Sequence, residues 1–213
     1  IQRGLRARIV LLDDIYNNYN GIDTPETIRN FINAAYQTWQ IDYVLLGGDT
    51  EIIPKRGVYG SCEGYVDYFI PCDMYYGCLD GNWDADGDGI YGEEEDNVDF
   101  LAEVYVGRAP VETPEEVQNF VNKTIQYENS VGEPYLRKVL FVGELLYYPD
   151  PLTWGGDYKD VIEQYFPQDY QIEKRYDKLG NFNGNGQIII DKINEGVHLI
   201  NHIGHSDYWM VMY

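Results

Sequence analysis

The chain has 213 residues, enough for one large domain or two small ones with a real hydrophobic core. Its 15 basic and 36 acidic residues give a formal charge of −21, and a surface of that sign repels nucleic acid and anionic membranes. We therefore expect no nucleic-acid partner, and we predict no membrane span because no run of about 18 apolar residues occurs.

Strands and helices alternate in the first part of the sequence. The run ARIVLLDD, residues 7–14, predicts a strand, and Thr24-Pro25-Glu26 predicts the start of a helix, because proline is favoured in the first helical turn. The apolar run at 43–49 predicts a strand covered on both faces. An irregular acidic stretch leads to a strand at 102–108 and to a helix that opens with a capping box at 113–116.

A second alternation follows a linker at residues 130–134. Strands are predicted at 138–144, 170–176 and 198–204, and helices at about 157–166 and 187–194. Repeated strand-helix-strand units indicate parallel sheets with right-handed crossovers, whose functional residues lie beyond the carboxyl ends of the strands. The expected fold class is α/β with two parallel-sheet units, a subdomain over residues 1–131 and a second one over 132–213.

All three histidines, His198, His202 and His205, lie in the last sixteen residues. On a helix they would share one face, as in a zinc hydrolase, but Gly196 and Gly204 and the apolar content of the segment favour a strand. On a strand, we expect His202 to point into packing and His205 to fall in a loop at the carboxyl end, where a general base belongs. A partly buried, hydrogen-bonded histidine without a catalytic role is the alternative for His205.

The segment INHIGHS, residues 200–206, resembles the turn that carries the catalytic histidine of gingipain-type cysteine peptidases, which have a caspase-like fold. Residues 28–56, 73–93 and 103–128 are similar to segments of that family, in the same order. The resemblance implies that the second unit is the start of a caspase-like domain. It also implies a cysteine endopeptidase that cleaves protein or peptide substrates with His205 as its base. Ser206 stands where the family usually has glycine.

The resemblance also bears on the nucleophile. In the family the catalytic cysteine follows the histidine, on the next strand, whereas Cys62, Cys72 and Cys78 all precede it here. A thiolate must lie within hydrogen-bond reach of the imidazole for this chemistry. We therefore expect the chain to stop between base and nucleophile, to be inactive alone, and to need the remainder of its own polypeptide.

Three further residues receive roles from their positions. Glu144, at the end of the strand 138–144, corresponds to the acid that the family places near the histidine, where a carboxylate orients the imidazole; a solvated strand-end glutamate is the alternative. Asp157 lies near the substrate-pocket aspartate of arginine-specific relatives, or it caps the following helix. For Arg108 we expect an ion pair with a buried carboxylate.

The sequence DADGDGIYGEEE, residues 84–95, fits an EF-hand-like calcium loop without flanking helices. The oxygen ligands predicted for Ca²⁺ come from Asp84, Asp86, Asp88, Glu95 and the main-chain carbonyl of Ile90, with Gly89 at the sharp turn. A solvated acidic loop is the alternative. Because extracellular calcium is plentiful and the resembled family is secreted, we expect a secreted or cell-surface location.

A second class of function competes with the peptidase. The chain would then be a non-catalytic, calcium-stabilised module of a secreted surface protein. A cysteine within about sixty residues beyond Tyr213, at the end of a strand, favours the peptidase, and its absence favours the module.

Overall fold

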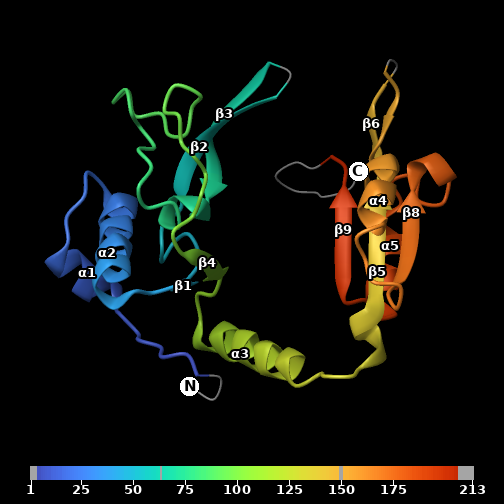
Figure 1. The fold of residues 1–213 in the computed structure, drawn as a ribbon, viewed down its shortest axis with the longest axis horizontal. Helices are drawn as coiled ribbons and strands as arrows, with labels where there is room; N and C mark the ends of the chain where they lie inside the picture. Colours follow the sequence, from blue (N-terminus) through green and yellow to red (C-terminus); the bar gives the residue numbers. More distant parts are fainter. Residues whose placement is uncertain (1–3, 63, 149–150, 206–213) are drawn as a thin grey trace. The chain divides into compact units, whose positions relative to one another are not determined.

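The computed structural model describes residues 4–62, 64–148 and 151–205 (Figure 1). The chain forms two compact units, Ile1–Gln126 and Tyr127–Tyr213. Both contain parallel strands and helices, which confirms the α/β class. Among the described residues, no helix has the length and apolar character needed to cross a membrane.

The first regular element among the described residues of this unit is a helix instead of the predicted strand at residues 7–14. Residues 5–11 have no regular secondary structure, and helix α1 runs over Leu12–Asn18. A short apolar run does not distinguish a strand from a buried helical segment. Asp13 and Asp14 favour the helix, because they place negative charge in its first turn, where the helix dipole stabilises an acidic side chain.

Helix α2, Thr24–Trp39, begins where the sequence predicts, with Pro25 in its first turn. The residue that caps it is Asp23, whose Oδ1 accepts a hydrogen bond from the main-chain N–H of Glu26 at 2.9 Å. The side of α2 that faces the core contributes the buried residues Thr27, Ile28, Ile32 and Ala35. This burial at helical spacing follows the sequence pattern.

Strands β1, Tyr43–Gly47, and β4, Tyr105–Ala109, pair in parallel. Leu46 is buried, whereas Tyr43 and Leu45 are exposed on the opposite face, so β1 is not covered on both faces within the described part of this unit. The sequence prediction of two covered faces is therefore wrong here.

Arg108 on β4 fixes the start of the acidic segment. Its guanidinium makes two hydrogen bonds to Asp73, both of 2.7 Å, which confirms the predicted ion pair. The carboxylate of Asp73 is half-buried, however, and not buried as predicted. The same side chain donates to the main-chain carbonyls of Gly48, Asp49 and Ile53. One arginine thus satisfies several carbonyl groups of the loop after β1.

The acidic stretch contains a hairpin that the sequence did not reveal. Strands β2, Arg56–Cys62, and β3, Tyr65–Cys72, pair antiparallel with an irregularity between Val58 and Gly60, and the short helix η1, Asp73–Tyr76, follows. Most of β3 is exposed, so the alternation of buried and solvated residues that identifies a strand is absent.

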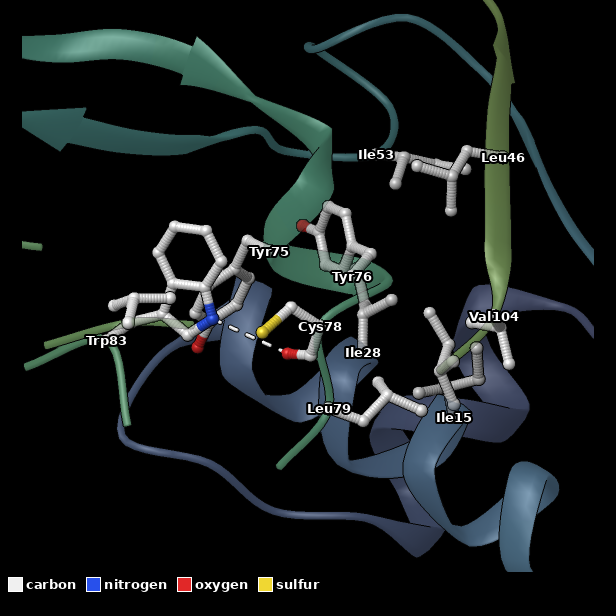
Figure 2. Packing of buried hydrophobic residues seen from close by; sticks show 12 residues of the cluster. Ile15, Ile28, Leu46, Ile53, Tyr75, Tyr76, Cys78, Leu79, Trp83 and Val104 are labelled. Atoms are coloured by element: carbon white, nitrogen blue, oxygen red, sulfur yellow. Dashed lines mark hydrogen bonds between the residues drawn. The ribbon is translucent and has the colours of Figure 1, made fainter. Parts of the chain in front are cut away.

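Aromatic side chains anchor this stretch in the core of the first unit (Figure 2). Tyr75, Tyr76 and Trp83 are each at most 2% exposed, and the ring of Tyr75 meets the other two edge to face. The indole N–H of Trp83 donates to the main-chain carbonyl of Cys78 at 3.4 Å. The loop that carries the acidic residues therefore begins at a fixed, buried point.

Helix α3, Pro114–Glu128, starts with the predicted capping box. The hydroxyl of Thr113 accepts from the N–H of Glu116 at 3.3 Å, and the carboxylate of Glu116 accepts from the N–H of Thr113 at 3.0 Å. None of the residues of α3 is buried. The short helix η2, Pro134–Arg137, precedes the second sheet.

The second unit is built on a parallel sheet of three strands in the order β8-β5-β9 (Figure 1). The strands are β5, Lys138–Gly143, β8, Gln171–Tyr176, and β9, Leu199–Ile203. The helices are α4, Gly155–Glu163, and α5, Gly186–Asn194, so all five elements overlap the predicted ranges. The smaller elements are β6, Leu145–Tyr147, β7, Thr153–Trp154, and η3, Asp177–Leu179.

Central strand β5 separates two apolar layers. On one face Leu140 and Val142 pack with Ile189 of α5, and on the other Val139 and Phe141 pack with Ile162 of α4. Side chains alternate along a strand, so Glu144, which follows β5, continues the row of Leu140 and Val142.

Candidate active site

Two parallel strands bring Glu144 and His205 to one edge of the second sheet. The last residues of β5 and β9, Gly143 and Ile203, are register partners, and the N–H of Glu144 donates to the carbonyl of Ile203 at 3.0 Å. Glu144 and His205 thus follow the carboxyl ends of adjacent strands, as the sequence predicts. Residues at this edge of a parallel sheet are placed to act on a ligand.

The carboxylate of Glu144 is buried, with a side chain 3% exposed, and it holds two partners. Oε2 accepts the main-chain N–H of His205 at 2.9 Å, and Oε1 lies 2.9 Å from Nε2 of His202. In the ring of His205, Nε2 lies 3.1 Å from the carbonyl oxygen of Leu145. Glu144 therefore supports His205 through the main chain.

The expectation that His202 points into packing is wrong. His202 is the register partner of Val142, so both side chains lie on the face of the sheet that Glu144 continues. The sequence of so short a strand does not indicate which of its faces meets Glu144. The register of pairing between β5 and β9 determines this face.

Glycines make this close arrangement possible. A Cβ built on Gly204 would lie 2.2 Å from Cδ of Glu144, and one built on Gly143 would lie 2.4 Å from the main-chain nitrogen of Gly156 in α4. The N–H of Gly155, where α4 begins, donates to the carbonyl of Glu144 at 2.8 Å. Helix and strand backbones can approach this closely only because no side chain intervenes.

Asp157 lies in the first turn of α4 and is exposed. The N-cap position is Trp154, without a side-chain capping bond, so Asp157 is not the cap. Its Oδ1 is 2.6 Å from Nζ of Lys178, in η3. The carboxylate therefore pairs with a basic side chain at the surface.

The cysteines whose side chains the structure describes do not resemble nucleophiles. Cys78 is 0% exposed, and its thiol lies 3.5 Å from Oδ1 of Asp99. Burial raises the pKa of Cys78, and the hydrogen bond to Asp99 raises it further. A thiol of this kind stays protonated at neutral pH. Cys72 is a free, half-buried thiol on β3.

The predicted calcium loop brings several carboxylates together. Oδ1 of Asp84 accepts from the N–H of Gly89 at 3.1 Å, and Oδ1 of Asp88 accepts from the N–H of Ile90 at 2.7 Å. Gly87 and Gly89 have positive φ values of 78° and 86°, which turn the chain around these oxygens.

Two groups of carboxylates have oxygens within 4.8 Å of one another: Asp84, Asp86 and Asp96, and Asp86, Asp88 and Glu93. Glu95, predicted as the last ligand, is exposed and belongs to neither group. Asp96 is 6% exposed and accepts the N–H groups of Ala85, Gly92 and Glu93. Asp96 is not predicted from the sequence, because the twelve-residue spacing selects Glu95 from a run of four acidic residues.

Comparison with protein families places these observations in context. The model of peptidase family C25 matches residues 1–213. The chain belongs to peptidase family C25. Membership confirms the resemblance drawn from the residues around His205 and agrees with a caspase-like α/β fold.

Curated relatives of the family are longer than this chain. Gingipain R2 of Porphyromonas gingivalis is 28% identical over an alignment of 213 positions, which covers 96% of this chain and 24% of that protein. Gingipain R1 of the same organism is also 28% identical, with 96% and 18% covered. Lys-gingipain is 25% identical over 154 residues, with 69% and 8% covered. The chain spans about a quarter or less of these relatives, and no solved structure matches it significantly.

Proposed function

We propose that the chain is the histidine-bearing part of a cysteine endopeptidase of family C25. The observation that supports this proposal most directly is the pairing of Glu144 with the main chain of His205 beyond two adjacent parallel strands. His205 is exposed and its ring stands at the edge of the sheet, so it is accessible to a thiol and to a substrate.

In this proposal His205 takes the proton of a cysteine thiol and returns it to the leaving amine. The thiolate attacks the scissile carbonyl, and water then hydrolyses the acyl-enzyme. The cysteine comes from the remainder of the polypeptide, since Cys62, Cys72 and Cys78 precede the histidine and lie in the first unit. The chain alone is expected to be inactive.

Asp157 is proposed as a substrate-binding acid. Its exposed carboxylate pairs with Lys178 in the structure, and a basic substrate side chain would compete for the same oxygen. Changing Asp157 to Asn should raise KM for substrates with arginine or lysine at the cleavage site and leave other substrates unaffected. An equal effect on all substrates would contradict this role.

We also propose that the loop binds a structural Ca²⁺. Hard oxygen donors fit this ion, and Asp84, Asp86 and Asp88 belong to the converging carboxylate groups. The carbonyl of Ile90 is kept as a ligand on the spacing of the sequence alone. Asp96 or Glu93 is better placed than Glu95 to complete the ligands, because both belong to the converging groups. With the acidic surface and the family, this favours a secreted or cell-surface protein.

The decisive experiment uses a chain extended beyond Tyr213 to include the downstream region. The extended protein should cleave peptides, lose activity with a thiol-alkylating reagent, and lose it with His205→Ala. Equal activity of the wild type and His205→Ala would remove His205 from the mechanism. An extended chain that folds and cleaves nothing would favour the non-catalytic, calcium-stabilised module.

A further inference from the structure

The buried carboxylate of Glu144 is shared between two histidines of the same strand end. His205 supplies its main-chain N–H to Oε2, and His202 supplies ring Nε2 to Oε1, each at 2.9 Å. The side chain of His202 is 20% exposed and that of Glu144 is 3% exposed. The contact between His202 and Glu144 is therefore largely screened from water.

An ionised carboxylate only accepts hydrogen bonds, so Nε2 of His202 carries the hydrogen when Glu144 is charged. Without this donor, Oε1 would stay buried with an unmet acceptor, which is costly for a charged group. The carboxylate would then move toward water and release the N–H of His205. The hydrogen bond from the ring of His202 therefore holds the carboxylate of Glu144 in its buried position.

We propose that His202 is a positioning residue for the peptidase reaction, acting through Glu144 on the main chain of His205. Since it concerns the placement of the general base, this inference rests on the proposed function. His202 does not touch the reacting atoms. It locks the loop Gly204-His205 so that the imidazole of His205 meets thiol and substrate at a fixed position.

The remaining histidine provides a matched control. His198 stands at the opposite end of β9, where its ring bonds to the carbonyl of Leu136 at 2.9 Å and to the hydroxyl of Tyr127 at 2.5 Å. These contacts lie within the second unit, at the start of the sheet, and far along the strand from Glu144. Changing His198 therefore tests the loss of a structural ring contact alone.

The kinetic test compares His202→Phe, His202→Gln and His198→Phe in the extended chain. Misplacing a catalytic group by about 1 Å costs roughly 10²-fold in rate, so His202→Phe should lower kcat by about that factor and change KM less than twofold. Gln carries an N–H donor and should restore kcat to within about tenfold of the wild type. His198→Phe should keep wild-type kcat per folded molecule.

A second measurement uses the 213-residue chain and needs no activity. Hydrogen exchange at the N–H of His205 should become about tenfold faster or more in His202→Phe, because its bond to a charged acceptor is lost. It should change little in His202→Gln or His198→Phe. Faster exchange in His202→Phe alone would support the positioning role of His202 even if the extended wild type were inactive. Inactivity of the extended wild type would count only against the proposed function.

Three outcomes would overturn the inference. The first is unchanged exchange at His205 in a folded His202→Phe chain. The second is wild-type kcat in the extended His202→Phe enzyme. The third is an equal loss of kcat in Phe and Gln variants that both fold. If His202→Phe does not fold, His202→Gln is read instead, and a loss of kcat near 10²-fold in that variant contradicts the role of the donor.

Discussion

Gly204 lies so close to the carboxylate of Glu144 that a Cβ in its place would come within 2.2 Å of Cδ. The end of a side chain can usually move aside. Glu144 cannot do so cheaply, because it is 2% exposed and both its oxygens are bonded. Gly204 is therefore the residue that lets the acid lie beneath the histidine loop.

Changing Gly204 to Ala should destabilise the second unit by about 1–3 kcal/mol, the cost of leaving buried polar groups without partners. Urea unfolding measures this free energy. Gly186→Ala is the control, because a Cβ at this position, at the start of α5, meets no atom of the described residues within 4 Å. A Gly204→Ala chain as stable as Gly186→Ala would show that Glu144 moves freely.

Asp23 and Arg56 should make the stability of the first unit depend on pH. Arg56 is 6% exposed and makes two bonds to Asp23, of 2.7 and 2.8 Å. Burial alone would raise the pKa of Asp23. The hydrogen bonds from Arg56 and from the N–H of Glu26 outweigh it and hold the pKa below the ordinary value of 3.8.

An acid whose pKa is lower in the folded state stabilises the fold above its unfolded pKa, and this stability is lost as the pH falls through the folded value. The difference in unfolding free energy between wild type and Asp23→Asn should therefore be constant from pH 7 to about pH 4 and shrink below. Thermal or urea unfolding across pH 2–7 tests it. A difference that stays the same at pH 2 would contradict the assigned shift.

Lys159 in α4 should destabilise the second unit while it is charged. It is 4% exposed, and its Nζ lies 2.5 Å from the neutral side-chain oxygen of Asn201. Burial lowers its pKa. Replacement by Met, which has similar length, should leave stability unchanged or raise it by about 1 kcal/mol at pH 7.

The difference in stability between wild type and Lys159→Met should change with pH in a definite direction. The wild type regains stability relative to Lys159→Met as the pH rises from the lowered pKa toward 10.5, because the folded lysine is then neutral. Lys192→Met should behave oppositely, because hydrogen bonds to Glu195 and Glu173 raise the pKa of Lys192. A marked loss of stability in Lys159→Met at pH 7 would mean that its ammonium has a stabilising partner.

The sequence predicts the sheet of the second unit well, for a physical reason. Strand β5 is buried throughout apart from its first residue, so it reads as a continuous apolar run. The rule for parallel sheets then brings Glu144 and His205 to one edge. The partner of His202 follows from the register Val142↔His202, which no local pattern encodes.

Elsewhere local patterns were ambiguous or misleading. The apolar run before Asp13 suits a strand and a helix equally, and the exposed hairpin strand β3 lacks alternation. The spacing of acidic residues along the loop selects Asp84, Asp86 and Asp88, and the structure brings oxygens of these residues close to those of Asp96 and Glu93. The end of the loop folds back on its start through two buried residues, Trp83 and Asp96. The spacing of acidic residues alone does not reveal this contact.

The calcium proposal predicts a stabilisation that depends on particular carboxylates. Partial desolvation and the charges of Asp88, Glu95 and its other acidic neighbours raise the pKa of Glu93, so like charges in the loop disfavour the ionised form of Glu93 when no cation is bound. Ca²⁺ at a hundredfold excess over Kd should add about 2.7 kcal/mol to the unfolding free energy. Thermal melts in Ca²⁺ and in chelator measure the effect.

Asp86 belongs to both groups of converging carboxylates, so Asp86→Asn should abolish the difference between Ca²⁺ and chelator. Glu95→Gln changes charge by the same amount but lies outside both groups, so it should retain most of the stabilisation. If Glu95→Gln abolished the stabilisation by Ca²⁺, Glu95 would be a ligand, as the spacing of the sequence predicts. Identical melting of the wild type with and without Ca²⁺ would leave the loop an acidic surface without a metal, because an ion bound only by the folded chain must raise its stability.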